Sequence, residues 1–171
     1  TANALAEILE SRFTCANTEL VDINDMRLWR QKIPFVKMHS CGNDYIYIEN
    51  FDNKITCPES LCVSYCTPHY GIGGDGLVLI ENSTVADVKM RIFNRDGSEG
   101  KMAGNCIRSV GKYVYDNGIV TDTQISVETG SGVKELELYT RDGKVTLVSV
   151  QMGKAEFSAK ALPALCDLDE M

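Results

Sequence analysis

Three polar, glycine-rich segments hold most of the residues whose types and spacing could do chemistry. They are residues 41–44 (Cys-Gly-Asn-Asp), residues 71–76 (Gly-Ile-Gly-Gly-Asp-Gly) and residues 93–108, which run from Phe-Asn-Arg-Asp-Gly-Ser-Glu into Met-Ala-Gly-Asn-Cys-Ile-Arg. Asparagine amides offer neutral donors and acceptors for an amino or a carboxyl group. Tight turns also use Gly, Asp and Asn, but turns alone are a poor explanation for all three segments together.

The third segment predicts a strand, a turn and then the first turn of a helix at about residues 103–105. The first N–H groups of a helix have no partner within it, and the helix dipole is positive there. Such an end binds carboxylate or phosphate groups, and a glycine there lets a ligand approach the backbone closely. We therefore expect one ligand site at the start of this helix. Its predicted binding residues are Asn43, Asn94, Gly104 and Asn105.

Other binding chemistries find weaker support. Residues 71–76 are followed by an apolar strand and carry no Walker lysine, which disfavours a nucleotide loop. Zinc-ligand residue types also cluster here, but their spacing fits no standard zinc motif. These residues are Cys57, Cys62, Cys66 and His69. Because free cysteine is commonly a small core residue, we predict no metal site.

Strand patterns supply the frame around these segments. Apolar or alternating runs predict strands at residues 45–48, 77–80, 88–93, 124–129, 133–139 and 145–151. The continuous apolar run 77–80 is typical of a strand buried on both faces. Aspartate-glycine pairs predict turns at residues 96–97 and 142–143.

Two helices are expected from residue 35 on. A capping box at Thr56 and Glu59 predicts a short helix. An apolar stripe between Ile107 and Val114 predicts a longer helix that ends at residues 117–118. With about seven strands, the pattern indicates an α+β fold, in which a curved mixed sheet surrounds one central helix.

Composition excludes several classes of protein. The chain has 171 residues, of which 44% are hydrophobic and 24% charged, values typical of a globular domain. Its net charge of −7 and the lack of a basic stripe argue against a nucleic-acid partner. No apolar run is long enough for a membrane span, and no secretory signal is evident. The odd count of seven cysteines favours reduced thiols in a cytoplasmic protein.

The chain divides into three predicted regions. Residues 1–33 carry helical spacing and form an N-terminal helical extension. Residues 34–157 form the α+β domain, and residues 158–171 form a tail or the start of a linker.

Together, the three segments resemble diaminopimelate epimerase, a cofactor-independent amino-acid isomerase of lysine and cell-wall biosynthesis. The resemblance runs from residue 35 to about residue 157 and is carried by residues 35–44, 66–76, 90–98 and 152–153. Related racemases that act on proline or hydroxyproline usually have histidine where this chain has Asn105, which favours the diaminopimelate branch. The resemblance implies an epimerase-like α+β half, an amino-acid substrate, no cofactor and a cytoplasmic homodimer.

Two departures from the family bear on activity. Ala103 stands where the resemblance places the first catalytic cysteine, and Cys106 is one helical turn past that position, so we expect Cys106 to be structural. The family is built of two similar halves that each give one cysteine, and this chain ends where the second half should begin. Because an alanine methyl cannot transfer a proton, we predict an inactive half. Without its partner half, the domain would leave apolar surface uncovered, and we expect self-association through that surface.

Two alternatives remain open. One is a non-catalytic amino-acid-binding or interaction module that keeps the pocket and has lost the chemistry. The other is a different racemase of the superfamily, with a carboxylate base such as Asp96 or Glu99.

Overall fold

The computed structural model describes residues 33–154 of the 171-residue chain. Most of the predicted N-terminal extension (1–33) and all of the predicted tail (158–171) lie outside the described residues. The limits proposed for the central domain, 34–157, therefore stay predictions.

Eight strands and two helices make up the described residues. The strands are β1 (Val36–Ser40), β2 (Asn43–Glu49), β3 (Gly76–Glu81), β4 (Val88–Asn94), β5 (Glu99–Gly100), β6 (Gln124–Thr129), β7 (Gly132–Arg141) and β8 (Lys144–Val150). The helices are α2 (Pro58–Cys66) and α3 (Gly104–Asp116). The order of the six predicted strands and two helices is confirmed, and β1 and the two-residue β5 are additions.

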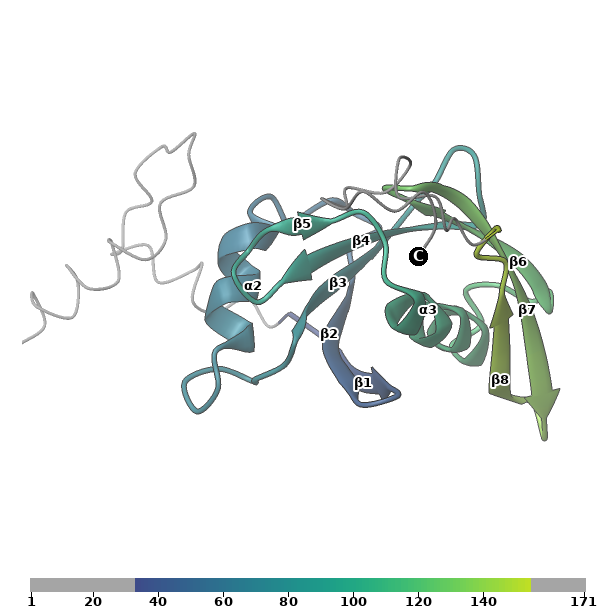
Figure 1. Cartoon of the computed structure of the whole chain (residues 1–171), viewed down its shortest axis with the longest axis horizontal. Helices are drawn as coiled ribbons and strands as arrows, with labels where there is room; N and C mark the ends of the chain where they lie inside the picture. The colour runs from purple at the N-terminus through teal and green to yellow at the C-terminus, as the bar shows by residue number, and fades with distance from the viewer. Residues whose placement is uncertain (1–32, 155–171) are drawn as a thin grey trace, which may run out of the picture.

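All strands belong to one mixed sheet with the order β1-β2-β3-β4-β6-β7-β8, and β5 pairs with β4. The β2–β3 and β4–β6 pairs are parallel, and the other pairs are antiparallel. Figure 1 shows the sheet curling around α3, while α2 lies on the outer side of β3 and β4. The predicted α+β class, a curved sheet around a central helix, is confirmed.

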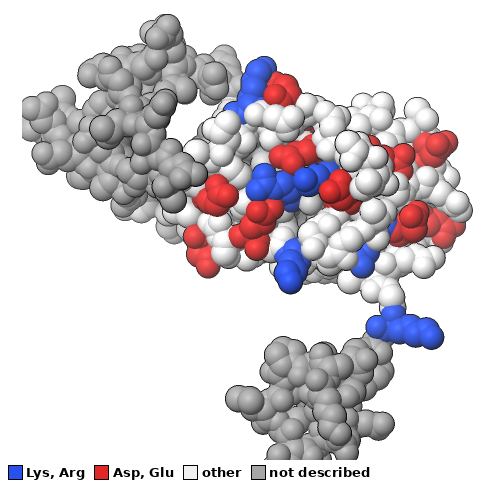
Figure 2. Space-filling model, turned by 90° about the horizontal axis from the view of Figure 1, so that it is seen from above, with Lys and Arg blue, Asp and Glu red and all other residues white. Residues whose placement is uncertain are grey.

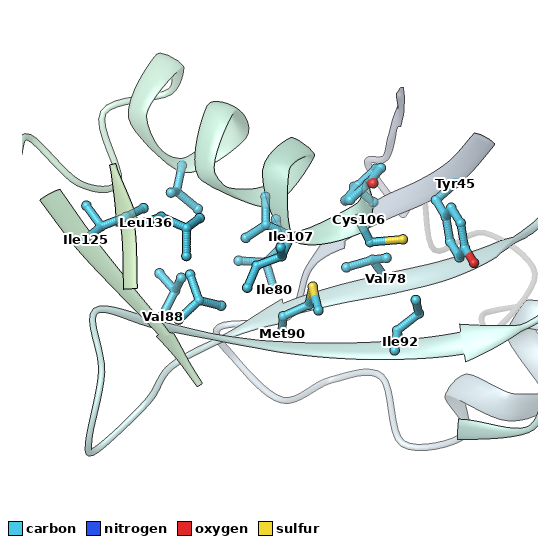
Figure 3. Packing of buried hydrophobic residues seen from close by; sticks show 14 of the residues in the cluster. Tyr45, Val78, Ile80, Val88, Met90, Ile92, Cys106, Ile107, Ile125 and Leu136 are labelled. Atoms are coloured by element: carbon cyan, nitrogen blue, oxygen red, sulfur yellow. The ribbon is translucent and has the colours of Figure 1, made fainter. Parts of the chain in front are cut away.

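The larger hydrophobic core fills the space between α3 and the inner face of the sheet. Figure 3 shows Val78, Ile80 and Met90 on the strands below Ile107 of α3. A smaller core lies between α2 and the outer face and includes Phe93. Since β3 contributes to both cores, all six of its residues are buried, as its continuous apolar run predicts.

Local sequence signals explain how α3 and the turns form. The apolar stripe of α3 is buried, and Asn117 caps the end of the helix, followed by Gly118 with a φ of +71°. A left-handed residue after the cap favours glycine because other side chains clash there. Asp142 and Gly143 have φ of +52° and +74°, and they join β7 to β8 as predicted.

The predicted capping box of α2 is wrong. The N-cap is Cys57 rather than Thr56, and it makes no side-chain capping hydrogen bond. Pro58 occupies the first helical position, where its fixed φ suits a helix and its missing N–H costs nothing. The proline therefore sets the start of α2 one residue later than the capping-box pattern indicates.

The cysteines of the described residues are mostly reduced. Cys41, Cys62, Cys66 and Cys106 are free thiols. These four agree with the expectation of reduced thiols.

The surface of the described residues carries both signs of charge. Figure 2 shows Lys and Arg interspersed with Asp and Glu on the face that it displays. Arg91 and Glu99 form a bidentate ion pair, with Nε–Oε1 and Nη2–Oε2 distances of 2.7 and 2.9 Å. No helix among residues 33–154 is long and apolar enough to cross a membrane.

Apolar side chains on the two end strands lead to a prediction about association. In the sheet order, β1 and β8 come first and last, and Leu147 of β8 is 62% exposed. An exposed apolar end strand favours pairing with another chain. We expect sedimentation velocity to show concentration-dependent association, which Leu147→Lys weakens. Val133→Lys on the interior strand β7 is the control, and a monomer at every concentration would contradict the prediction.

Candidate functional site

The start of β2 lies beside the start of α3. Cys41 and Gly42 form the turn between β1 and β2, with φ of +53° and +86°, and Asn43 is the first residue of β2. Asn105, in the first turn of α3, donates Nδ2 to Asn43 Oδ1 at 2.7 Å. The fold thus brings together two of the predicted binding residues that are 62 positions apart in the sequence.

The N-terminus of α3 has the properties of an anion-binding helix end. Its N-cap, Ala103, has no side chain able to accept a hydrogen bond from the first turn, and that turn holds no acidic residue. The leading N–H groups therefore keep their positive partial charge for a ligand. Gly104 leaves the approach open, since a Cβ there would meet only the end of the Met152 side chain, at 3.7 Å from Cε.

Asn94 lies on the same face of the sheet as Asn43, but its side chain bonds to Ser98 rather than to Asn105. The register aligns Tyr45 of β2, Gly76 of β3 and Asn94 of β4, so their side-chain positions share one face. Ile92, two residues before Asn94, belongs to the core beneath α3. The Asn94 amide donates Nδ2 to Ser98 Oγ at 3.0 Å, inside the β4–β5 turn. A ligand contact by Asn94 therefore stays a prediction.

The second glycine-rich segment supports the site from the side. The Asp75 N–H donates to the Asp44 carbonyl at 2.6 Å, and the Asp44 N–H donates to Asp75 Oδ2 at 2.9 Å. This reciprocal pair holds the residue that follows Asn43. Arg95 adds an ion pair to Asp75 with an Nη2–Oδ1 distance of 3.3 Å. The segment therefore fixes the position of the start of β2, which agrees with the interpretation of its glycines as turn formers.

Sequence reasoning missed two residues of this site. Arg108 donates from Nη2 to Asn105 Oδ1 and to Cys41 Sγ, the latter at 3.3 Å. Its spacing of three residues from Asn105 places both on one helix face, and this signal could have identified it. Met152 lies near Gly104 only because the chain after β8 returns to the start of α3, and no local pattern predicts that.

Cys106 points away from the site. Its side chain is 1% exposed and lies in the core with Tyr45, as Figure 3 shows. Burial raises the pKa of the Cys106 thiol to about 11. A position in the first helical turn would by itself lower a thiol pKa, so burial decides the direction here. The location supports the expectation that Cys106 is structural.

The burial pattern predicts which thiols react. Cys41 is exposed, whereas Cys62, Cys66 and Cys106 are buried. We expect iodoacetamide to alkylate Cys41 in the native chain and the other three only in denaturant, because the reagent must reach the sulfur. Peptide mass spectrometry measures this directly. Native labelling of Cys106 at the rate of Cys41 would show that the core assignment is wrong.

The carboxylates considered as an alternative base are engaged elsewhere. Glu99 is held by Arg91, which lowers its pKa, and it pairs in register with Phe93 of the outer core. Its side chain therefore lies on the face opposite to Asn43. Asp96 accepts hydrogen bonds from the Ser98 N–H and Oγ, which lower its pKa. Both carboxylates therefore have partners other than the residues at the start of α3.

Neither a metal cluster nor a cavity near Tyr113 adds to this site among the described residues. Within residues 33–154, no group of three or more His, Cys, Asp or Glu side chains is close enough to hold a metal ion. Cys62 and Cys66 instead lie in the outer core with their sulfurs 3.7 Å apart. A cavity of about 550 Å³ lies near Tyr113, toward the far end of α3, and contains none of the predicted site residues.

Comparison with known proteins gives consistent matches. A sequence model of the family described as diaminopimelate epimerase matches residues 35–158. A diaminopimelate epimerase of Methanococcus maripaludis is 50% identical over 133 residues, which cover 78% of this chain and 48% of that protein. One of Agathobacter rectalis is 47% identical over 131 residues, covering 77% and 46%. The chain spans about half the length of the curated relatives it matches.

Solved structures with low sequence identity share the fold. A methylitaconate-delta-isomerase aligns with a TM-score of 0.57 and 20% identity, covering 77% of this chain and 39% of that one. A hydroxyproline epimerase from Agrobacterium vitis aligns with a TM-score of 0.55 and 17% identity, covering 72% and 42%. At these identities, the matches bear on architecture alone.

Proposed function

The chain belongs to the diaminopimelate epimerase family, and we propose that it forms the N-terminal half of an enzyme that interconverts LL- and meso-diaminopimelate. The observation that carries this proposal is the contact of Asn105 with Asn43 at the open N-terminus of α3. That arrangement presents amides and unpaired N–H groups to one small polar ligand. The missing C-terminal half of the same enzyme is the proposed partner.

The proposed chemistry is inversion of an α-carbon without a cofactor. Such a reaction needs a base on one face of the carbon and an acid on the other. The N-terminus of α3 would bind the substrate carboxylate and stabilise negative charge as the α-proton leaves. In the family's pattern, a cysteine at position 103 would take or return that proton. With Ala103 in its place, this half retains binding groups and lacks the proton-transfer group.

A second candidate function is a non-catalytic amino-acid-binding module. Ala103 favours it, because the binding residues are present while the proton-transfer group is absent. The two candidates differ in the expected effect of a cysteine at position 103. If the chain is an epimerase half, Ala103→Cys introduces α-proton exchange; if it is a binding module, Ala103→Cys introduces none.

We further propose, from the resemblance, that the complete protein is a cytoplasmic homodimer. Size-exclusion chromatography of the complete protein tests the dimer, and fractionation of the source cells tests the compartment.

Ligand binding tests the proposed site. We expect Asn43→Ala to raise the Kd for LL-diaminopimelate by about tenfold, since it removes one hydrogen bond to a charged group. Asn82→Ala is the control, because Asn82 is an exposed asparagine whose amide bonds the Phe51 carbonyl. NMR titration of both variants gives the two constants. Equal affinities for Asn43→Ala and wild type would contradict the site.

A further inference from the structure

Arg108 controls which end of the Asn105 amide faces the interior. Its half-buried guanidinium donates from Nη2 to Asn105 Oδ1. A guanidinium has five N–H donors and no acceptor, so only the oxygen of the Asn105 amide can face it. The amide nitrogen of Asn105 must then point the other way.

This orientation passes on to the next amide. The outward-facing Asn105 Nδ2 donates to Asn43 at 2.7 Å, and it can do so only to the oxygen, Oδ1. The Asn43 Nδ2 group is then the last hydrogen-bond donor in the series that runs from Arg108 through Asn105 to Asn43. Had the first amide been reversed, Asn43 would offer its oxygen instead, and that end would suit an ammonium group.

We propose that Arg108 is a positioning residue that orients both amides, so that Asn43 presents N–H donors to a carboxylate of the ligand rather than an acceptor to its ammonium group. This inference rests on the proposed function, since it names the group of an amino-acid ligand that this half-site recognises. Asn43 and the first N–H groups of α3 then both donate hydrogen bonds to negatively charged groups of the ligand.

A purely stabilising role suits Arg108 poorly. Its Nε is buried without a hydrogen-bond partner among the described residues. An unpaired buried donor destabilises a fold, so packing alone would favour an apolar side chain at this position. The guanidinium contacts with Asn105 and Cys41 give an arginine at this position a role that an apolar side chain could not fill.

Two simple molecules separate the two kinds of recognition. Pimelate is diaminopimelate without its two amino groups. 1,5-Diaminopentane is diaminopimelate without its two carboxylates. In NMR titrations of the ¹⁵N-labelled chain, we expect pimelate and LL-diaminopimelate to shift the Asn43 side-chain NH₂ signals. We expect 1,5-diaminopentane to leave them unchanged. The opposite pattern would overturn the proposal.

Variants of α3 test the role of Arg108. We expect Arg108→Gln to raise the Kd for pimelate about tenfold, the change for one hydrogen bond to a charged group. Arg108→Lys keeps the charge on one nitrogen and should restore part of the affinity. Lys112→Gln removes the same charge one turn further along the helix, where Lys112 pairs with Asp116, and should change the Kd less than about twofold. An equal loss with Lys112→Gln would show that only net charge matters.

A measurement on the free protein separates this inference from the proposed function. In wild type, the Asn105 side-chain NH₂ protons should give NOEs to the Asn43 side chain, and Arg108→Gln should abolish them while circular dichroism stays native. Retained NOEs would overturn the orienting role even if ligands bind. Failure of all three molecules to bind wild type would overturn carboxylate recognition and the proposed function, while the NOEs still decide the role of Arg108.

Discussion

Incubated with LL-diaminopimelate in D₂O, this chain is expected to exchange the substrate α-proton no faster than buffer does. Position 103 carries a methyl group where the family's pattern places a thiol, and the N-cap has no other group able to move a proton. Loss of a general base typically costs about 10²–10⁴-fold in rate. Mass spectrometry of the recovered amino acid measures deuterium at the α-carbon. Exchange above the buffer rate would show that another group has taken the role.

Ala103→Cys is the matched variant for that experiment. A thiol at the N-terminus of α3 would have a lowered pKa, so we expect it to be alkylated in the native chain and to accelerate α-proton exchange. Inversion should stay absent, because the opposite face of the carbon still lacks an acid. An inert Ala103→Cys variant that binds the ligand normally would favour the non-catalytic binding module.

Gly76→Ala is expected to destabilise the chain by about 3 kcal/mol, at the upper end of overpacking effects. A Cβ at Gly76 would overlap the carbonyl oxygen of Phe93 and lie 2.7 Å from Cε1 of Tyr45. The first neighbour is backbone of a central strand and the second is a buried ring, so neither can move freely. A loss of this size is a large part of the stability of an ordinary domain. Urea unfolding followed by circular dichroism measures it.

Gly104→Ala is the control for the same change. A Cβ there would make ordinary contact, at 3.7 Å, with the flexible end of Met152. Gly104 is also the first residue of α3, where alanine is well tolerated. We expect its unfolding free energy to stay within about 1 kcal/mol of wild type. Similar losses in both variants would contradict the packing assigned to Gly76.

Local patterns in the sequence determined the elements. The apolar stripe of α3, the buried run of β3 and the aspartate-glycine turn before β8 all depend on neighbours within a few positions. Such signals act through backbone preference and side-chain periodicity, and they need no knowledge of the rest of the chain. The same locality explains the error at α2, where Pro58 sets the start of the helix although Thr56 and Glu59 match the capping-box pattern.

The polar, glycine-rich segments also predicted Asn43, Asn94, Gly104 and Asn105 as binding residues, but only the tertiary structure decided how these residues relate. Asn43 meets Asn105 because the sheet curls and brings the start of β2 to the start of α3. Asn94, on the same face, is bonded to Ser98 instead. Cys106 is buried because its direction on the helix points into the core.

The sequence by itself thus determined which residues could serve the site, and the tertiary structure decided which of them touch. The role of Arg108 is the clearest case. Its side chain reaches Cys41, 67 positions away, and sets the direction of a hydrogen-bond chain that ends at Asn43. Hydrogen bonds depend on distances of a few tenths of an ångström and on which amide atom faces a donor. These quantities follow from long-range packing, which no short stretch of residues encodes.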